Sequence, residues 1–99
     1  MDLNKMIYLN VKGLCKLKNT KIGLLESKIG MQTGYMSRIG KGAVNISLKA
    51  TFEIAEYFGI TIDELIHGDY KLEILEEEIQ ETLERLKVLQ KEKQKLKGV

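Results

Sequence analysis

The residues from 32 to 41 carry the side chains whose types and spacing are best suited to contacting another molecule. Met36 and Ile39, three apart, mark the inner face of a short helix, so polar groups project from its opposite face. The candidates there that could contact DNA bases are Gln32, Thr33, Gly34, Ser37 and Arg38. In the major groove an arginine can donate two hydrogen bonds to guanine, a glutamine can pair with adenine, and a threonine methyl can contact thymine. Gly34 would let the helix approach closely. Alternatively, Arg38 binds only phosphate and Gln32 only ends a turn.

Catalytic chemistry has little support in this sequence. Cys15 and His67 are the only cysteine and the only histidine, which is too few for a metal site or for a nucleophile with its base. The glycines fall at expected helix ends rather than in a phosphate-binding loop. We therefore expect no enzymatic activity, no metal and no cofactor, with Cys15 as a small core residue and His67 at the end of a helix.

The elements that position these residues are expected to be helices throughout. The chain has no proline, and its apolar residues recur three and four apart. A first helix ends near residues 18–20, Thr20 is a candidate N-cap for the second, and a turn of about three or four residues leads to the third. The residues expected to face inward are, in chain order, Leu3, Met6, Ile7, Val11 and Leu14; Ile22, Leu25 and Ile29; Met36 and Ile39; Leu48, Phe52, Ala55 and Phe58; Leu65 and Ile66.

Short local signals mark the remaining helix ends. Gly30 and Gly59 stand where a left-handed residue commonly ends a helix. Ser47 is a good N-cap for the fourth helix. Residues 61–64 match the T-x-x-E capping box that starts a fifth helix. Asp69 can cap a last helix, which is expected from about residue 70 to residue 97.

Charge is distributed unevenly along the chain. Residues 1–50 carry nine basic and two acidic side chains, whereas residues 51–70 carry five acidic side chains and no lysine or arginine. A basic half beside an acidic half suits a domain that turns one face to a polyanion. Ordinary surface charge is the alternative explanation.

Two segments resemble the helix-turn-helix of the lambda-repressor and Cro-like (XRE-type) transcriptional regulators. Residues 21–42 read KIGLLESKIGMQTGYMSRIGKG, and residues 47–66 read SLKATFEIAEYFGITIDELI. The chain departs from the family in having Gly40 where a glutamate is common, and Gln32 where serine or threonine is common. The resemblance implies an all-α fold, in which a five-helix DNA-binding domain spans residues 1–68.

The family's docking mode implies which residues hold the DNA backbone. Lys21 at the start of the second helix and Lys41 after the third are placed to contact phosphate. Tyr35 is a further phosphate-contact candidate through its hydroxyl group, although a half-buried structural role is the favoured alternative.

Residues 69–99 are expected to form a long, coiled-coil-like helix. Heptad positions a and d hold apolar residues at six of eight places, which are the candidate dimerisation residues Leu72, Leu75, Ile79, Leu86, Leu89 and Leu96. The alternative is an amphipathic helix folded back on its own domain, which Ile74, Leu83 and Val88 would favour. Residues 71–84 carry six acidic groups and one basic group, and residues 85–97 carry six basic groups and one acidic group. Antiparallel pairing places opposite charges beside each other, so it is the favoured arrangement.

With the resemblance, these features predict a sequence-specific DNA-binding transcriptional regulator. We expect a phage-type repressor that acts as a homodimer on double-stranded DNA, with no small-molecule effector. The alternatives are a helix-turn-helix scaffold that binds another protein as an inhibitor or antirepressor, and weak binding of DNA without regard to sequence. The charged N-terminal segment, the lone cysteine and the lack of a long apolar run favour a cytoplasmic protein without a membrane association.

Overall fold

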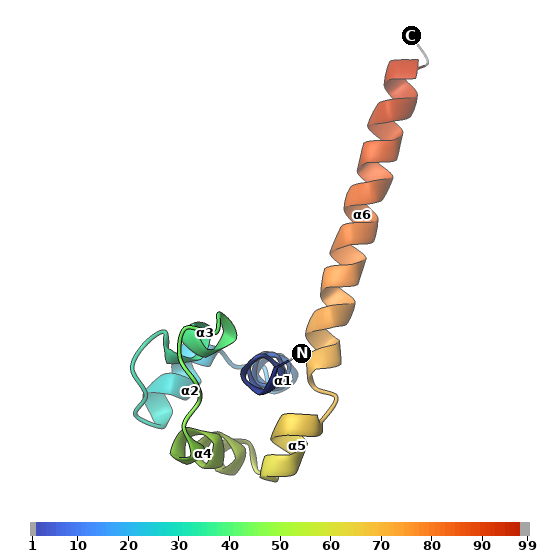
Figure 1. The fold of residues 1–99 in the computed structure, drawn as a ribbon. Helices are drawn as coiled ribbons and strands as arrows, with labels where there is room; N and C mark the ends of the chain where they lie inside the picture. The colour runs from blue at the N-terminus through green and yellow to red at the C-terminus, as the bar shows by residue number, and fades with distance from the viewer. Residues whose placement is uncertain (1, 98–99) are drawn as a thin grey trace.

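The computed structural model describes residues 2–97, which are helical between their turns and contain no strand. The helices are α1 (Leu3–Leu17), α2 (Ile22–Lys28), α3 (Tyr35–Gly40), α4 (Leu48–Phe58), α5 (Ile62–His67) and α6 (Lys71–Lys97). Figure 1 shows α1 among the shorter helices α2 to α5, and α6 running away from them. The prediction of an all-α chain, with five helices followed by a long C-terminal helix, is confirmed. None of the described helices is both long enough and apolar enough to cross a membrane.

Helix α1 is central because its apolar face meets several helices at once. Ile7, Val11 and Leu14 are each at most 2% exposed, and α1 packs against α2, α3, α5 and α6. Cys15 is buried among them, as predicted. Leu3, which was predicted to face inward, is instead 52% exposed at the open end of the helix. The other helices complete the core with Leu25, Met36, Ile39, Ile54, Ala55 and Leu65.

Side-chain caps define several helix starts. The Ser47 hydroxyl accepts a hydrogen bond from the backbone N–H of Ala50 at 3.0 Å, and the predicted capping box of Thr61 and Glu64 is complete. The prediction for Thr20 is wrong, because α2 begins after Lys21 without a side-chain cap. The Thr20 hydroxyl is buried and has no hydrogen-bond partner among the described residues.

Helix α4 buries only part of the face that was expected. Leu48 is 80% exposed and Phe52 is 57% exposed, so the prediction that they face inward is wrong. Ala55 is buried and Phe58 packs against the core, as predicted, and the buried face also holds Ala50, Thr51 and Ile54. Both faces carry apolar residues, and the face with two alanines permits closer packing. Thr51 tolerates burial because its hydroxyl donates to the Ser47 carbonyl at 2.9 Å.

The connection between α2 and α3 is longer than predicted. It runs from residue 29 to residue 34, six residues in place of about three or four. Gly30 and Gly34 both have left-handed backbones, with φ of 75° and 88°, and Gly34 is the N-cap of α3. Such values suit glycine because it has no Cβ. As a result α3 begins only at Tyr35, and Gln32 and Thr33 lie in the turn before it.

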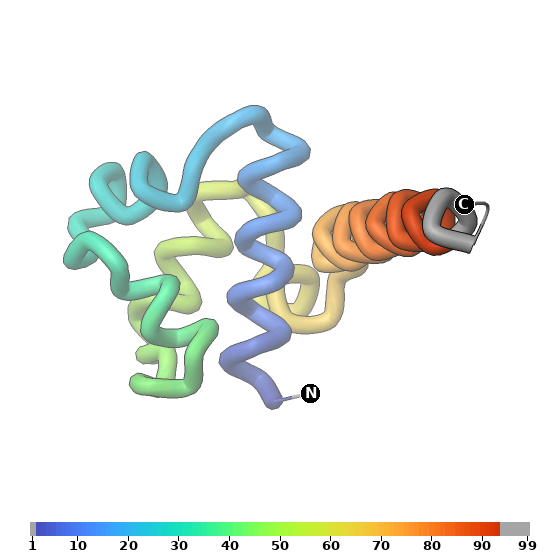
Figure 2. The backbone as a smooth tube through the Cα atoms, turned by 90° about the horizontal axis from the view of Figure 1, so that it is seen from above, coloured from blue at the N-terminus to red at the C-terminus, as the bar shows by residue number. Residues whose placement is uncertain are grey.

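The start of α6 is attached to the domain through Asn10, which is fully buried. Its amide nitrogen donates to the carbonyls of Leu65 (2.8 Å) and Ile66 (3.3 Å), and its side-chain oxygen accepts from the backbone N–H of Lys71 (2.7 Å). These bonds join α1, the end of α5 and the first residue of α6. Beyond this junction α6 projects outward (Figure 2), which gives the molecule extents of 61 × 25 × 23 Å.

Candidate nucleic-acid interface

The buried carboxylate of Glu26 holds α3 in place. Glu26 lies on α2 and is only 4% exposed. One oxygen accepts from the backbone N–H of Gly34 at 3.2 Å, and the other from that of Met36 at 3.0 Å. These two N–H groups lie at the N-terminal end of α3, where the helix leaves backbone donors unsatisfied. Glu26 therefore joins the two helices across the turn.

Sequence reasoning missed Glu26 because it was counted only as a surface charge. A signal was present, since Glu26 directly follows the buried Leu25 and lies three residues before Ile29, which packs against the core. An acid at the edge of a buried helix face needs a donor nearby. The backbone at the start of the next helix is such a donor.

Helix α3 presents the expected face to solvent. Met36 and Ile39 are fully buried, as predicted, so Ser37 and Arg38 point away from the core and are partly exposed. The Arg38 guanidinium lies close to Gly34, with Nη1 3.4 Å from the place where a Cβ would be. The absence of a side chain at Gly34 thus leaves room for Arg38.

Three of the candidate base readers lie before the helix, and one of them, Gly34, is its N-cap rather than a residue of its outward face. Gln32 and Thr33 are exposed in the turn, whereas Thr33 was predicted on the outward face of the third helix. That assignment to the helix is wrong, because the left-handed Gly34 starts α3 later in the chain. Gln32 lies before the helix, at the leading corner where it was predicted.

The three candidates for phosphate contact have different surroundings. Lys21 is the N-cap residue of α2 and Lys41 is the C-cap residue of α3, and both are exposed. Tyr35 is half-buried, and its hydroxyl oxygen accepts from the backbone N–H of Ser47 at 3.2 Å. This bond supports the structural role favoured for Tyr35, while leaving its hydroxyl proton free to be donated.

The positive charges near α3 are not neutralised within the described part of the chain. Among residues 2–93, whose side chains are described, the ion pairs are Lys16 with Glu77, Lys49 with Glu53, and His67 with Asp63. Lys21, Arg38 and Lys41 take part in none of them. Cationic side chains that no carboxylate neutralises attract polyanions.

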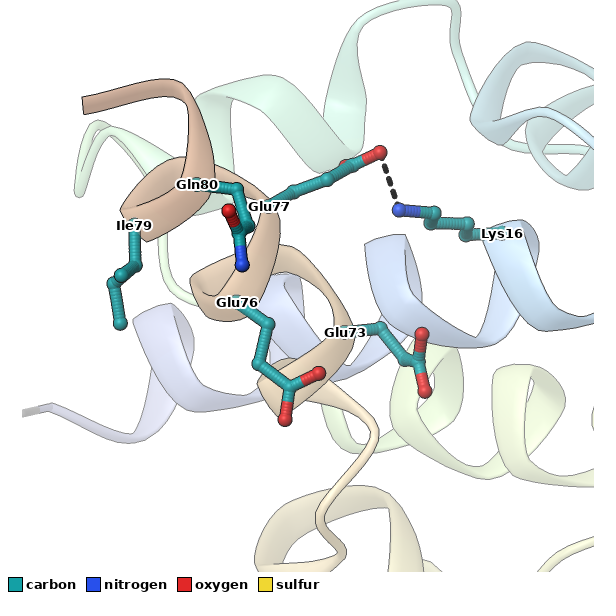
Figure 3. A pocket seen from close by; sticks show the side chains of 6 residues that line it. All are labelled: Lys16, Glu73, Glu76, Glu77, Ile79 and Gln80. Atoms are coloured by element: carbon teal, nitrogen blue, oxygen red, sulfur yellow. Dashed lines mark ion pairs between the residues drawn. The ribbon is translucent and has the colours of Figure 1, made fainter. Parts of the chain in front are cut away.

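Residues 2–93, whose side chains are described, hold no cluster of side chains that could bind a metal ion, at this interface or elsewhere. Desolvation by burial raises the pKa of the Cys15 thiol to about 11, which keeps it protonated and unreactive. A shallow pocket beside the Lys16–Glu77 ion pair is lined by Glu73, Glu76, Ile79 and Gln80 of α6 (Figure 3).

The predicted dimerisation residues form an uncovered surface on α6. Leu72, Ile79, Leu86 and Leu89 are between 45% and 59% exposed, and Leu75 is partly buried. The side chain of Leu96 lies outside the described residues. Ile74 is 8% exposed at the base of the helix. The alternative considered for this helix was that it folds back on its own domain. Only the first turns of α6 do so.

The two-helix unit of α2 and α3 thus carries polar and cationic side chains that are accessible to solvent. The long helix α6 is attached to the domain at α1. Comparisons of the chain with protein-family models, with curated proteins and with solved structures find no match.

Proposed function

We propose that the protein is a sequence-specific DNA-binding transcriptional regulator that acts as a homodimer on an operator, as phage-type repressors do. The observation that carries this proposal is the Glu26 cap, which fixes α3 against α2 while Arg38 faces outward. Reading a base sequence requires a rigid helix with donors on its free face. The Glu26 cap and the outward position of Arg38 support these two conditions at α3.

In the proposed complex, α3 enters the major groove. Arg38 donates two hydrogen bonds to a guanine, and Gln32, at the corner before the helix, pairs with an adenine. Thr33 and Ser37 contact neighbouring base edges. Lys21 and Lys41, at opposite ends of the two-helix unit, contact phosphates and set its register.

The homodimer is proposed to form through α6. Its exposed leucine and isoleucine side chains need a partner to remove them from water. Antiparallel pairing would place the acidic residues 71–84 of one copy beside the basic residues 85–97 of the other. A helix of 27 residues is about 40 Å long. That length is comparable to the spacing of about 34 Å between half-sites one DNA turn apart.

The test of sequence reading is a selection of random DNA duplexes on the purified protein, run beside Arg38→Ala. We expect a palindromic sequence to be enriched, and the substitution to weaken or relax its selection at one base position in each half-site. Lys91→Ala is a matched control, because Lys91 is exposed on α6 at a heptad position away from the pairing surface. The absence of any enriched sequence would contradict the proposal.

The test of the dimer is disulfide cross-linking in a Cys15→Ser background. Variants carrying Glu73→Cys and Gln94→Cys should form links between residue 73 of one chain and residue 94 of the other. Links only between residues 73 of the two chains would contradict the antiparallel arrangement.

A second candidate function is protein binding, as an inhibitor or antirepressor. Exposed Leu48 and Phe52 on α4 favour it, because they form an apolar surface beside the acidic Glu56. On this alternative, Leu48→Ala with Phe52→Ala would abolish function, while Arg38→Ala would leave it intact. The DNA-binding proposal predicts the reverse.

A further inference from the structure

We propose that α1 contacts the DNA backbone through Lys5 and Lys12, which flank the ring of Tyr8; these three residues are the α1 lysine patch. This inference rests on the proposed function and extends it, because it adds a phosphate-binding surface outside the helix-turn-helix. Neither the charge pattern nor the resemblance identified these residues individually.

The patch is a preformed arrangement of two cations around one aromatic ring. The ammonium nitrogen of Lys5 lies 5.9 Å from the centre of the Tyr8 ring, and that of Lys12 lies 5.5 Å from it. The spacings of three and four residues place all three side chains on one face of α1. A cation held over an aromatic face is stabilised by the ring and loses less conformational freedom when it binds a ligand.

Both lysines keep their charge unpaired. Within the described residues neither Lys5 nor Lys12 has a carboxylate partner, whereas Lys16, farther along the same helix, pairs with Glu77. The patch therefore adds two positive charges that the rest of the described chain leaves available. A lysine ammonium group whose N–H donors have no carboxylate partner commonly binds phosphate.

The patch adjoins the end of α3 directly. A Cβ added to Gly40 would lie only 2.4 Å from Cδ1 of Tyr8, so the ring rests against the last residue of α3. Lys41 follows immediately. A DNA backbone that contacts Lys41 would therefore pass close to Tyr8 and its lysines.

The start of α1 is also tied to the loop that follows α3. The Asn4 side-chain oxygen accepts from the backbone N–H of Ile46 at 2.9 Å, and its nitrogen donates to the side-chain oxygen of Asn45 at 2.9 Å. These bonds hold α1 beside α3. In Figure 2, α1 runs between the α2–α3 unit and α6.

The experiment measures the affinity of the selected operator duplex over a range of salt concentrations. Affinity falls as salt rises, and each lost phosphate contact makes the negative slope of log affinity against log salt shallower by about 0.9. Lys5→Gln with Lys12→Gln should therefore reduce the magnitude of the slope by about 1.8 for each bound protomer, without changing the preferred sequence. Lys5→Arg with Lys12→Arg should restore most of the slope.

Lys18→Gln with Lys28→Gln is the matched control. It removes the same charge from exposed positions at the ends of α1 and α2 that neither the α1 lysine patch nor the proposed dimer contact includes, so it should leave the slope nearly unchanged. Circular dichroism of all variants checks that the helices are retained.

The outcomes separate this inference from the function on which it rests. An enriched operator whose salt slope is the same for the wild type and for Lys5→Gln with Lys12→Gln would overturn the inference alone. A changed base preference in that variant would also overturn it, because the lysines would then read bases. A wild-type protein that selects no operator would overturn the proposed function and this inference with it.

Discussion

The two long helices, α1 and α6, differ sharply in what covers them. α1 has 15 residues, and seven of them are buried beneath its neighbours. α6 has 27 residues, yet among those whose side chains are described only Ile74 is buried. Both helices carry apolar residues at helical spacing. This contrast shows that an apolar pattern predicts which face of a helix will be covered. It does not predict whether the same chain or another chain covers that face.

The largest expected effect tests this difference with matched leucines. Leu25→Ala, in the core, should lower the free energy of unfolding by about 3–4 kcal/mol, because it removes a fully buried side chain and leaves a cavity. Leu86→Ala, on α6, should change it by less than about 0.5 kcal/mol at protein concentrations too low for pairing. Urea unfolding measures both. A large loss for Leu86→Ala under those conditions would show that α6 packs on its own domain.

Leu86→Ala has a second readout that Leu25→Ala lacks. If α6 pairs between chains, the substitution should weaken self-association measured by sedimentation. Unchanged self-association would place the dimer contact elsewhere.

The second largest effect on the free energy of unfolding is expected for the buried carboxylate of Glu26. Glu26→Ala should cost about 2–3 kcal/mol, because it leaves the N–H groups of Gly34 and Met36 without an acceptor. Glu26→Gln keeps one acceptor oxygen and should cost about half as much. Exposed Glu84→Ala on α6 is the control for loss of an acid. Equal stability of all three variants, by urea unfolding, would contradict the role of Glu26.

Breaking the junction between α1 and α6 should have a smaller effect on stability. Asn10→Ala removes three hydrogen bonds between α1, α5 and the start of α6, and should cost about 2 kcal/mol. Hydrogen exchange should then increase at Lys71 and the first turn of α6 more than at α3. A uniform increase over the whole domain would show that Asn10 stabilises the core rather than the junction.

The smallest effect is expected for the surface contact between the same helices. The Lys16 and Glu77 side chains are 40% and 55% exposed, and water screens their attraction. A double-mutant cycle with Lys16→Ala and Glu77→Ala should give a coupling energy of about 0.5 kcal/mol. A coupling above about 2 kcal/mol would show that this ion pair, rather than Asn10, holds α6 on α1.

Local patterns in the chain were sufficient to predict most of the secondary structure. Ser47, the Thr61–Glu64 capping box and Gly59 mark helix ends through bonds within a few residues, so their neighbours in sequence determine them. The burial of Met36 and Ile39, which sets the outward face of α3, followed from spacing alone. The resemblance to a helix-turn-helix family remains a prediction about function.

Tertiary structure decided the features that depend on distant partners. α4 has two apolar faces, and only the position of its neighbours selects the one with Ala50 over the one with Leu48. Glu26 and Asn10 link helices only because each accepts a hydrogen bond from a backbone N–H of another element. These donors lie eight and 61 residues farther along the chain. Whether α6 lies on the domain or extends from it depends on which surfaces it meets after folding. Periodicity cannot supply that information, because it specifies a face of a helix and leaves the partner open.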